Sequence, residues 1–274
     1  MWYELVKKRN YRLYLPKYSF SYMTPVIILV SFFVLHWYAS LFFQSMFHHR
    51  YAAHGMFRMS KFWEKTFHIG AFITQGSSYL SPYAYGVMHR IHHAFADKEG
   101  DPHSPLIDKD LFAMMWRTRK VYLEINQEVA VIGDKFKKGV PKWRKFDKFA
   151  EAKLTRLIWV AIYILIYVYF ESPWWLYVLI PIHILMSPVH GAIINWYSHK
   201  YGYRNYDVKD TSHNLFPVDL LMWGESLHNN HHKFGGRPNF GVKWFEFDPM
   251  YPVLRVMNKL KIIRIRNIPP TQYM

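Results

Sequence analysis

The stretch MTPVIILVSFFVLHWYASLFFQSMF, residues 23–47, contains no charged side chain. About 20 consecutive apolar residues in an α-helix cross the roughly 30 Å hydrocarbon core of a bilayer, because each residue adds about 1.5 Å. Residues 23–47 exceed that length, and a tryptophan and a tyrosine lie among them, as is common near the membrane surface. The sequence therefore predicts a transmembrane helix here.

Two later stretches are also free of charge, LIWVAIYILIYVYF at 157–170 and PWWLYVLIPIHILMSPVHGAIINWYS at 173–198. The shorter one reaches spanning length if Lys153 and Arg156 extend their charged ends to the interface. We therefore predict further spans at about 154–171 and 173–197. A turn at 171–173 would make them a hairpin, whose two ends emerge on one side of the membrane.

Charge indicates which side that is. Lysine and arginine number 35 against 19 acidic residues, a net charge of +16, and they concentrate in segments such as KFKKGVPKWRKFDK at 135–148 and KLKIIRIR at 259–266. Short basic segments beside membrane spans favour the cytoplasm. In a membrane protein such charge fits an anionic lipid surface and an acidic redox partner better than nucleic acid. The chain has no cysteine, which excludes disulfides and cysteine-ligated iron–sulfur clusters.

The start of the chain leaves its topology open. A single crossing by residues 23–47 would place the basic N-terminal residues outside, against the charge rule, whereas a re-entrant hairpin would keep them inside. Nothing there resembles a cleaved signal peptide. These basic residues are Lys7, Lys8, Arg9, Arg12 and Lys17.

Histidine patterning is the strongest functional signal. Among 16 histidines the pattern H-x-x-H-H occurs twice, at 89–93 (HRIHH) and 228–232 (HNNHH), although about 0.05 copies are expected by chance. A third cluster, HRYAAH, occupies 49–54. Clusters so widely separated in the sequence indicate ligands that folding brings together.

Imidazole is the commonest nitrogen ligand of transition metals and suits iron, zinc, copper and nickel alike. On an α-helix, residues four apart share a face, so His89 with His93 and His228 with His232 are natural chelating pairs. Because the clusters flank the predicted spans, a metal transporter, which would hold its ligands near mid-membrane, is the more remote alternative.

These motifs resemble those of the membrane fatty acyl desaturases of the stearoyl, delta-9 type, especially their short bacterial members. The resemblance rests on HRYAAH, HRIHH followed by DPHSP, NWYSH and GESLHNNHH, and it covers about residues 25–245. It implies two iron ions, for which zinc can substitute in purified samples. The implied ligands are nine histidines: His49, His54, His89, His92, His93, His199, His228, His231 and His232.

Helical spacing suggests how these ligands divide. We expect His49, His54, His89, His93 and His231 around one metal, and His92, His199, His228 and His232 around the other. Asn195, one helical turn before His199, would hold a water at an open position of the second metal. Three carboxylates near the clusters are expected to accept imidazole N–H bonds and fix tautomers: Glu225, Asp97 and Asp101.

The remaining polar residues receive lesser roles. The resemblance places Gln75 near the acyl carbonyl of the substrate. His103, in DPHSP, is expected to be structural or exposed. The histidines within the predicted spans are expected to bond between helices: His36, His183 and His190.

The sequence as a whole predicts one domain over 1–274, an all-α integral membrane protein. Three to four transmembrane helices would carry a cytoplasmic helical cap, from residues 48–153 and 198–274, that holds the two-metal site. The expected reaction is oxygen-dependent desaturation of a long acyl chain, linked to CoA or to a lipid, with electrons from a separate ferredoxin or small cytochrome. If the protein is bacterial, it would lie in the inner membrane. A hydroxylase with the same site is the alternative, since the two reactions diverge only after hydrogen abstraction.

Overall fold

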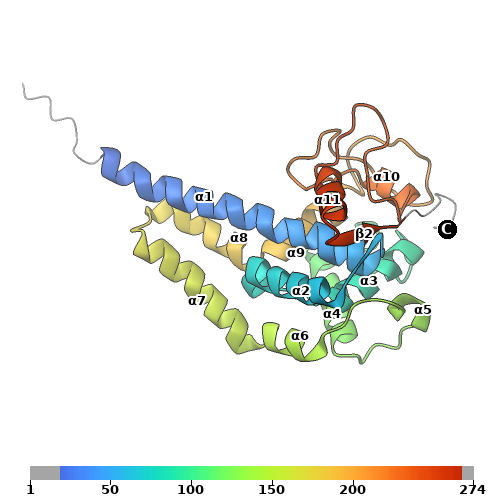
Figure 1. Ribbon diagram of the computed structural model, residues 1–274, viewed down its shortest axis with the longest axis horizontal. Helices are drawn as coiled ribbons and strands as arrows, with labels where there is room; N and C mark the ends of the chain where they lie inside the picture. Colours follow the sequence, from blue (N-terminus) through green and yellow to red (C-terminus); the bar gives the residue numbers. More distant parts are fainter. Residues whose placement is uncertain (1–18, 267–274) are drawn as a thin grey trace, which may run out of the picture.

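A computed structural model describes residues 19–266, so the basic N-terminal residues named above lie outside it. Helix α1 (Ser19–Phe43) continues into a π-helix, η1 (Gln44–Ala53). The stretch Met23–Ala53 is one uninterrupted helix, and among the described residues it is the helix that is by itself long and apolar enough to cross a membrane. In Figure 1 this blue helix runs along the molecule into the cap.

The second predicted span lies on α7 (Lys153–Tyr169), which follows the short helix α6 (Arg144–Ala150) at a bend of 49°. The expected turn is present: Glu171 has a φ of 49°, and the chain reverses into η3 (Trp174–Leu179) and α8 (Ile180–Ile184). Counted with α6, α7 reaches spanning length.

The third predicted span is bent rather than straight. Helix α8 ends at Ile184, and α9 (Met186–Ala192) and the π-helix η4 (Ile193–Tyr197) continue at 76° to the segment before them. Pro188 explains the break, because it has no N–H for the carbonyl of Ile184 and its ring would clash with that carbonyl. The described chain thus holds up to three spans, if each bent pair crosses once, and the expected number of three to four stays a prediction.

The cap surrounds the far end of η1 (Figure 1). After β1 (Phe57–Met59), helix α2 (Lys61–Gln75) folds back against α1, and the 3-10 turn η2 (Gly76–Ser78) leads into α3 (Pro82–Phe95), which packs on η1. The rest of the cap consists of irregular loops and five further elements: α4 (Leu111–Asn126), α5 (Asp134–Lys137), α10 (His228–Lys233), α11 (Met250–Lys259) and β2 (Ile263–Ile265).

Two short strands depart from the all-α expectation. β1 and β2 pair antiparallel, with Phe57 opposite Ile265, and so tie the end of the chain to the loop after η1. The apolar core beneath them joins η1, α2 and α11, and its buried members include Phe47, Phe57 and Leu254. This core fixes the direction in which η1 presents its histidines.

Within the predicted spans, His36 Nδ1 on α1 lies 2.6 Å from His183 Nδ1 on α8, and Tyr167 on α7 bonds the other nitrogen of His183 at 3.0 Å. His190 Nδ1 lies 3.3 Å from Gln44 Oε1. The expectation that these histidines bond between helices is confirmed.

Candidate metal centre

The first histidine cluster depends on the π-helical turn. His49 and His54 are five residues apart, a spacing that would separate them widely around an α-helix. In η1 the N–H of His54 donates to the carbonyl of His49 over 3.1 Å, the i to i+5 bond of a π-helix. The wider turn brings both rings to the same side.

Helix α3 supplies the second cluster. Ser81 caps its start by accepting from the Ala84 N–H at 3.4 Å, and Pro82 occupies the first turn, where a missing N–H costs nothing. The regular helix that follows places His89 and His93 one above the other, as their spacing predicts, and turns His92 toward the neighbouring group.

The third cluster lies on α10, which is only six residues long and is held in place by its asparagines. The Asn229 carboxamide accepts from the backbone N–H of Asn205 and Tyr206, at 2.9 Å each. The Asn230 carboxamide donates to the Phe240 carbonyl at 2.9 Å. The asparagines in HNNHH therefore anchor the helix while its histidines point inward.

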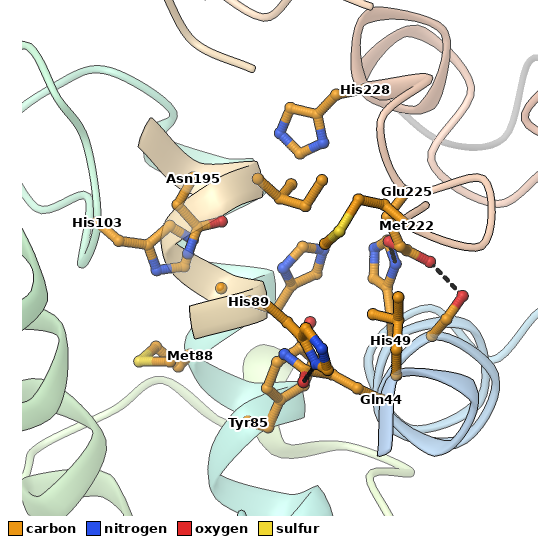
Figure 2. A pocket seen from close by; sticks show the side chains of 15 residues that line it. Gln44, His49, Tyr85, Met88, His89, His103, Asn195, Met222, Glu225 and His228 are labelled. Carbon is orange, nitrogen blue, oxygen red and sulfur yellow. Dashed lines mark hydrogen bonds and ion pairs between the residues drawn. The ribbon is translucent and has the colours of Figure 1, made fainter. Parts of the chain in front are cut away.

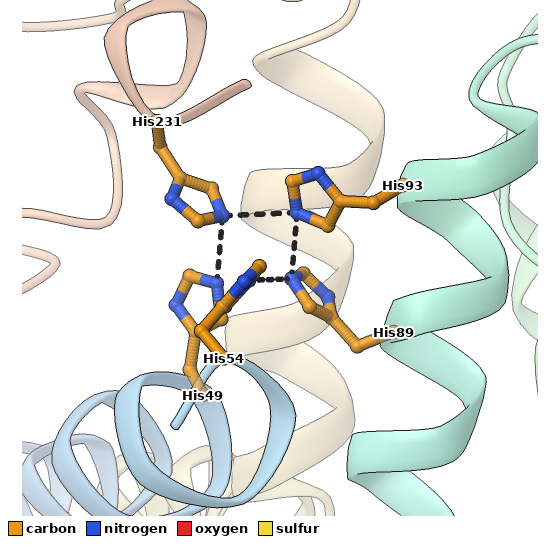
Figure 3. Close-up of side chains that lie close together, drawn as sticks. All are labelled: His49, His54, His89, His93 and His231. Atoms are coloured by element: carbon orange, nitrogen blue, oxygen red, sulfur yellow. Dashed lines mark hydrogen bonds between the residues drawn. The ribbon is translucent and has the colours of Figure 1, made fainter. Parts of the chain in front are cut away.

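Five imidazoles meet in the first group (Figure 3). The Nε2 atoms of His89 and His54 lie 2.9 Å apart, and Nε2 of His93 lies 3.0 Å from those of His89 and His231. His49 Nε2 closes the group at 3.0 Å from His231 Nε2. All five offer ligand nitrogens within 4.8 Å of one another.

Four imidazoles form the second group beside it. His92 Nε2 lies 3.4 Å from His232 Nε2, and His199 Nε2 lies 3.1 Å from His228 Nε2. The two groups adjoin, since the His93 and His232 ring centroids are 4.6 Å apart. We call the five-histidine group site 1 and the four-histidine group site 2. Their memberships match the division expected from spacing, while metal binding itself stays a prediction.

Carboxylates hold the outer nitrogens of four of these rings. Asp101 accepts from His92 Nδ1 at 2.9 Å, and Asp97 accepts from His199 Nδ1 at 3.0 Å. Burial raises the pKa of both carboxyl groups, but the hydrogen bonds from these histidines and the electrostatic attraction to them outweigh it and keep each pKa well below the usual range. Both are therefore anions at neutral pH.

Glu225 and Asp210 complete this set. Glu225 lies three residues before His228 in the sequence, and its carboxylate contacts His49 Nδ1, so its partner is an imidazole of site 1. Asp210 accepts from His232 Nδ1 at 2.9 Å, and the sequence did not single it out. Site 2 thus has three carboxylate partners and site 1 has one.

Arg50 modifies the single carboxylate of site 1. Its guanidinium is fully buried, lies 2.5 Å from Glu225 and 2.9 Å from Asp248, and covers the Phe240 ring at 3.9 Å. Burial raises the pKa of Glu225, but the charges of His49 and Arg50 outweigh it and lower the pKa. Part of the negative charge near site 1 is therefore balanced within the protein.

The ligand nitrogens suit a cation. Burial, and then the neighbouring rings, lower the pKa well below 6.5 for six of the nine imidazoles, which are therefore neutral. Each Nε2 atom carries either a proton or a lone pair, so five converging nitrogens cannot all pair with one another. A metal ion satisfies them together, and an all-imidazole set with carboxylates behind it fits iron, zinc, copper or nickel.

A cavity of about 50 Å³ opens against both groups (Figure 2). That volume holds one or two water-sized molecules. Leu41 and Met222 form apolar parts of its wall, and Asn195 from η4 lies in the same wall as His228. Asn195 therefore lines the cavity, while its hold on a metal-bound water stays a prediction.

His103 packs beside the second histidine group. It is buried, its ring lies tilted against the His92 ring at 4.3 Å between centroids, and it lines the same cavity as Asn195. Neither of its ring nitrogens has a partner among the described residues. Of the two expectations for His103, structural or exposed, the buried position excludes the second. Its position two residues after Asp101 in DPHSP was the available sequence signal.

Gln75 does not line the cavity. It is fully buried at the end of α2, and its Oε1 accepts from the Leu80 N–H at 3.2 Å. Contact between Gln75 and a substrate therefore stays a prediction from the resemblance alone. His48, the neighbour of His49, does not join either histidine group and bonds the carbonyls of Phe43 and Leu80.

The sequence model of a family described as fatty acid desaturase matches residues 21–261. The chain is 28% identical over 211 residues to delta-9 acyl-lipid desaturase 1 of Arabidopsis thaliana, covering 77% of this chain and 66% of the plant protein.

Two further relatives show the same level of similarity. The sn-1 stearoyl-lipid 9-desaturase of Synechocystis sp. is 28% identical over 81% of this chain and 66% of its own length. The icosanoyl-CoA 5-desaturase of Limnanthes douglasii is 28% identical over 84% of this chain and 62% of its own. The chain thus spans slightly less than two thirds of each of these three relatives.

Proposed function

The chain belongs to the fatty acid desaturase family, and we propose that it introduces a double bond into a long fatty acyl chain, with dioxygen as the oxidant. The observation that carries this proposal is the pair of histidine groups, one of five imidazoles and one of four. Both groups contribute to the wall of one cavity beside the end of the membrane helix. Neither group belongs to the apolar middle of a span, which weighs against metal transport.

Two iron ions would be held by the nine imidazoles of sites 1 and 2. When bound, they supply the oxygen activation and electron transfer needed to break unactivated C–H bonds, which amino-acid side chains cannot do alone. Overall the reaction takes two hydrogens from the chain, adds two electrons and two protons, and reduces dioxygen to two waters. Zinc in a purified sample would reflect substitution for iron, because the same nitrogen ligands suit both.

The protein residues position and shield this chemistry. Asp97, Asp101, Asp210 and Glu225 accept the outer N–H of their imidazoles, so each Nε2 faces inward without a proton. Leu41 and the flexible methionines supply part of the apolar wall of the cavity. Since 50 Å³ is too small for more than a short piece of chain, these side chains must move when a substrate enters.

The position of the cavity supports an acyl substrate. Leu41 and Gln44 line it from the last turns of the apolar helix, so the reacting methylenes would lie at the level where the hydrocarbon of the bilayer ends. The relatives act by name on both acyl-lipids and acyl-CoA. We propose delta-9 desaturation of an acyl chain that is bound to either carrier.

Electrons would come from a separate protein of the ferredoxin or small-cytochrome type. Such donors are often acidic, and the segment around α5 and α6 offers a basic cytoplasmic face. Its exposed cations include Lys135, Lys138, Lys145 and Lys148.

Product analysis tests the proposal directly. The chain is expressed with a suitable electron donor in cells that lack unsaturated fatty acids, and the lipids are examined for double bonds and their positions. New cis-monoenes are expected, whereas hydroxylated chains would refute desaturation in favour of oxygen insertion. His92→Ala and His231→Ala, one from each site, should abolish the product while the protein still inserts in membranes; retained activity in either would refute the nine-ligand assignment.

A further inference from the structure

An apolar loop of the cap lies against the membrane helix. The segment FPVDLL, residues 216–221, exposes four large apolar side chains: Phe216 at 45%, Val218 at 50%, Leu220 at 60% and Leu221 at 47%. Its one charged residue, Asp219, is fully buried and accepts from the backbone N–H of Met222 and Ser226 at 3.0 and 2.8 Å. The segment therefore presents a surface without charge.

A neighbouring segment of the chain adds to this surface. Val218 pairs with Phe247, whose N–H donates to the Pro217 carbonyl at 2.8 Å, and Phe247 is itself 44% exposed. We call the exposed side chains of Phe216, Val218, Leu220, Leu221 and Phe247 the 216–221 patch. Five exposed large apolar side chains on two paired segments indicate a partner that covers them.

Contacts with α1 show which partner that is. The Trp37 indole N–H donates to the Leu221 carbonyl at 3.2 Å, and the Tyr38 and Phe42 rings contact Trp223 at 6.2 and 6.1 Å between centroids. Trp37 lies six residues before Phe43, where α1 ends, which places it about 9 Å further into the apolar helix. The loop thus docks on the apolar part of α1, beside the tryptophan and tyrosine that favour the boundary between hydrocarbon and headgroups.

We propose that the 216–221 patch is immersed in the membrane leaflet next to the cap, with lipid acyl chains as its partner. The buried Asp219 accepts the N–H groups of Met222 and Ser226, so these two backbone donors need no water. Met222, which follows Leu221, is buried and lines the cavity, as Leu41 does. One short segment therefore separates bilayer lipid from the cavity.

A consequence concerns substrate entry, and it rests on the proposed function. If the patch is immersed, an acyl chain carried by a membrane lipid reaches the cavity by moving sideways past residues 216–222, without leaving the bilayer. The immersion itself is independent of any activity and is tested without turnover.

The absence of cysteine makes a depth measurement simple. Single variants Leu220→Cys and Phe216→Cys are spin-labelled in the full chain, reconstituted in phosphatidylcholine–phosphatidylglycerol bilayers. The matched controls are Leu35→Cys, on α1 and 69% exposed, and Asp207→Cys, a fully exposed charged position in the same connection. Accessibility of each label to oxygen, which concentrates in lipid, is compared with its accessibility to a water-soluble nickel chelate.

The labels at 220 and 216 are expected to resemble that at 35, with an oxygen-to-nickel ratio several-fold higher than at 207. A ratio at both loop positions equal to that at 207 would overturn the proposal. If the labels are immersed and the protein makes no unsaturated lipid, the proposed function fails while the membrane contact stands.

Discussion

Asp210→Asn tests whether the carboxylates behind the imidazoles create the metal centre. Asp210 Oδ1 accepts from the Ser212 N–H at 2.9 Å, and Oδ2 accepts from His232 Nδ1 at 2.9 Å. An asparagine keeps the first bond with its carbonyl oxygen, so its NH₂ group then faces His232. Two donors would meet unless the ring moves its proton to Nε2.

That proton transfer blocks the ligand atom. Nε2 of His232 is the nitrogen that lies 3.4 Å from His92 Nε2 within site 2, and a metal ion requires it unprotonated. Loss of such an outer carboxylate typically costs about 10–100-fold in metal affinity. This corresponds to about 1.4–2.7 kcal/mol of binding free energy. Site 1 keeps all five imidazoles, so we expect the loss at one of two metals.

The measurement is a metal-binding competition with a coloured chelator on the purified protein, using Zn²⁺ or Co²⁺. Parent protein should bind two ions, and Asp210→Asn should bind one tightly and one about 10–100-fold more weakly. Asp207→Asn is the matched control, because Asp207 lies three residues away and is fully exposed. Two tightly held ions in Asp210→Asn, or an equal loss in Asp207→Asn, would refute the argument.

Three further predictions concern stability. In the metal-free protein the six imidazoles with lowered pKa stay neutral in the folded state but take up protons below pH 6.5 in the unfolded state. The free energy of unfolding should therefore decrease as the pH is lowered below 6.5, by up to about 1.4 kcal/mol per imidazole per pH unit. Equal melting temperatures in detergent at pH 6.5 and 5.5 would contradict this. Arg50→Leu leaves Glu225 and Asp248 without their cation and should cost about 3–5 kcal/mol in denaturant unfolding, whereas Arg58→Leu, at an exposed position, should change it by less than about 0.5 kcal/mol. Gly224→Ala should lower the thermal midpoint, because Gly224 has a φ of 87° and an added Cβ would lie 2.1 Å from Asp248 Oδ1; an unchanged midpoint would show that the turn adapts.

The sequence predicts the parts of this protein that depend on regular spacing. The charge-free run at 23–47 identifies α1, and residues four apart identify the chelating pairs on α3 and α10. The five-residue spacing of His49 and His54 is different, because it suits one metal only through the π-helical turn of η1. Nothing in a local pattern distinguishes that turn from an α-helix.

Contacts made by irregular loops lie beyond such reasoning. Asp210 belongs to the connection between η4 and α10, 22 residues before His232, where no periodicity relates the two. The same connection carries the apolar segment at 216–221, which is too short to register as a span. The bend in the third predicted span has a sequence signal, since Pro181 and Pro188 both interrupt that stretch.

The distribution of carboxylates offers a physical reason for the unequal ligand sets. A carboxylate that accepts an imidazole N–H makes the opposite nitrogen a stronger donor to a metal. Site 2 has one imidazole fewer than site 1 but two carboxylate partners more, and the one partner of site 1 shares its charge with Arg50. The extra negative charge would therefore offset the missing ring for a metal bound at site 2, which contributes His228 to the cavity wall. A ligand set completed by charge rather than by a fifth imidazole would leave room at such a metal for a further ligand beside this cavity.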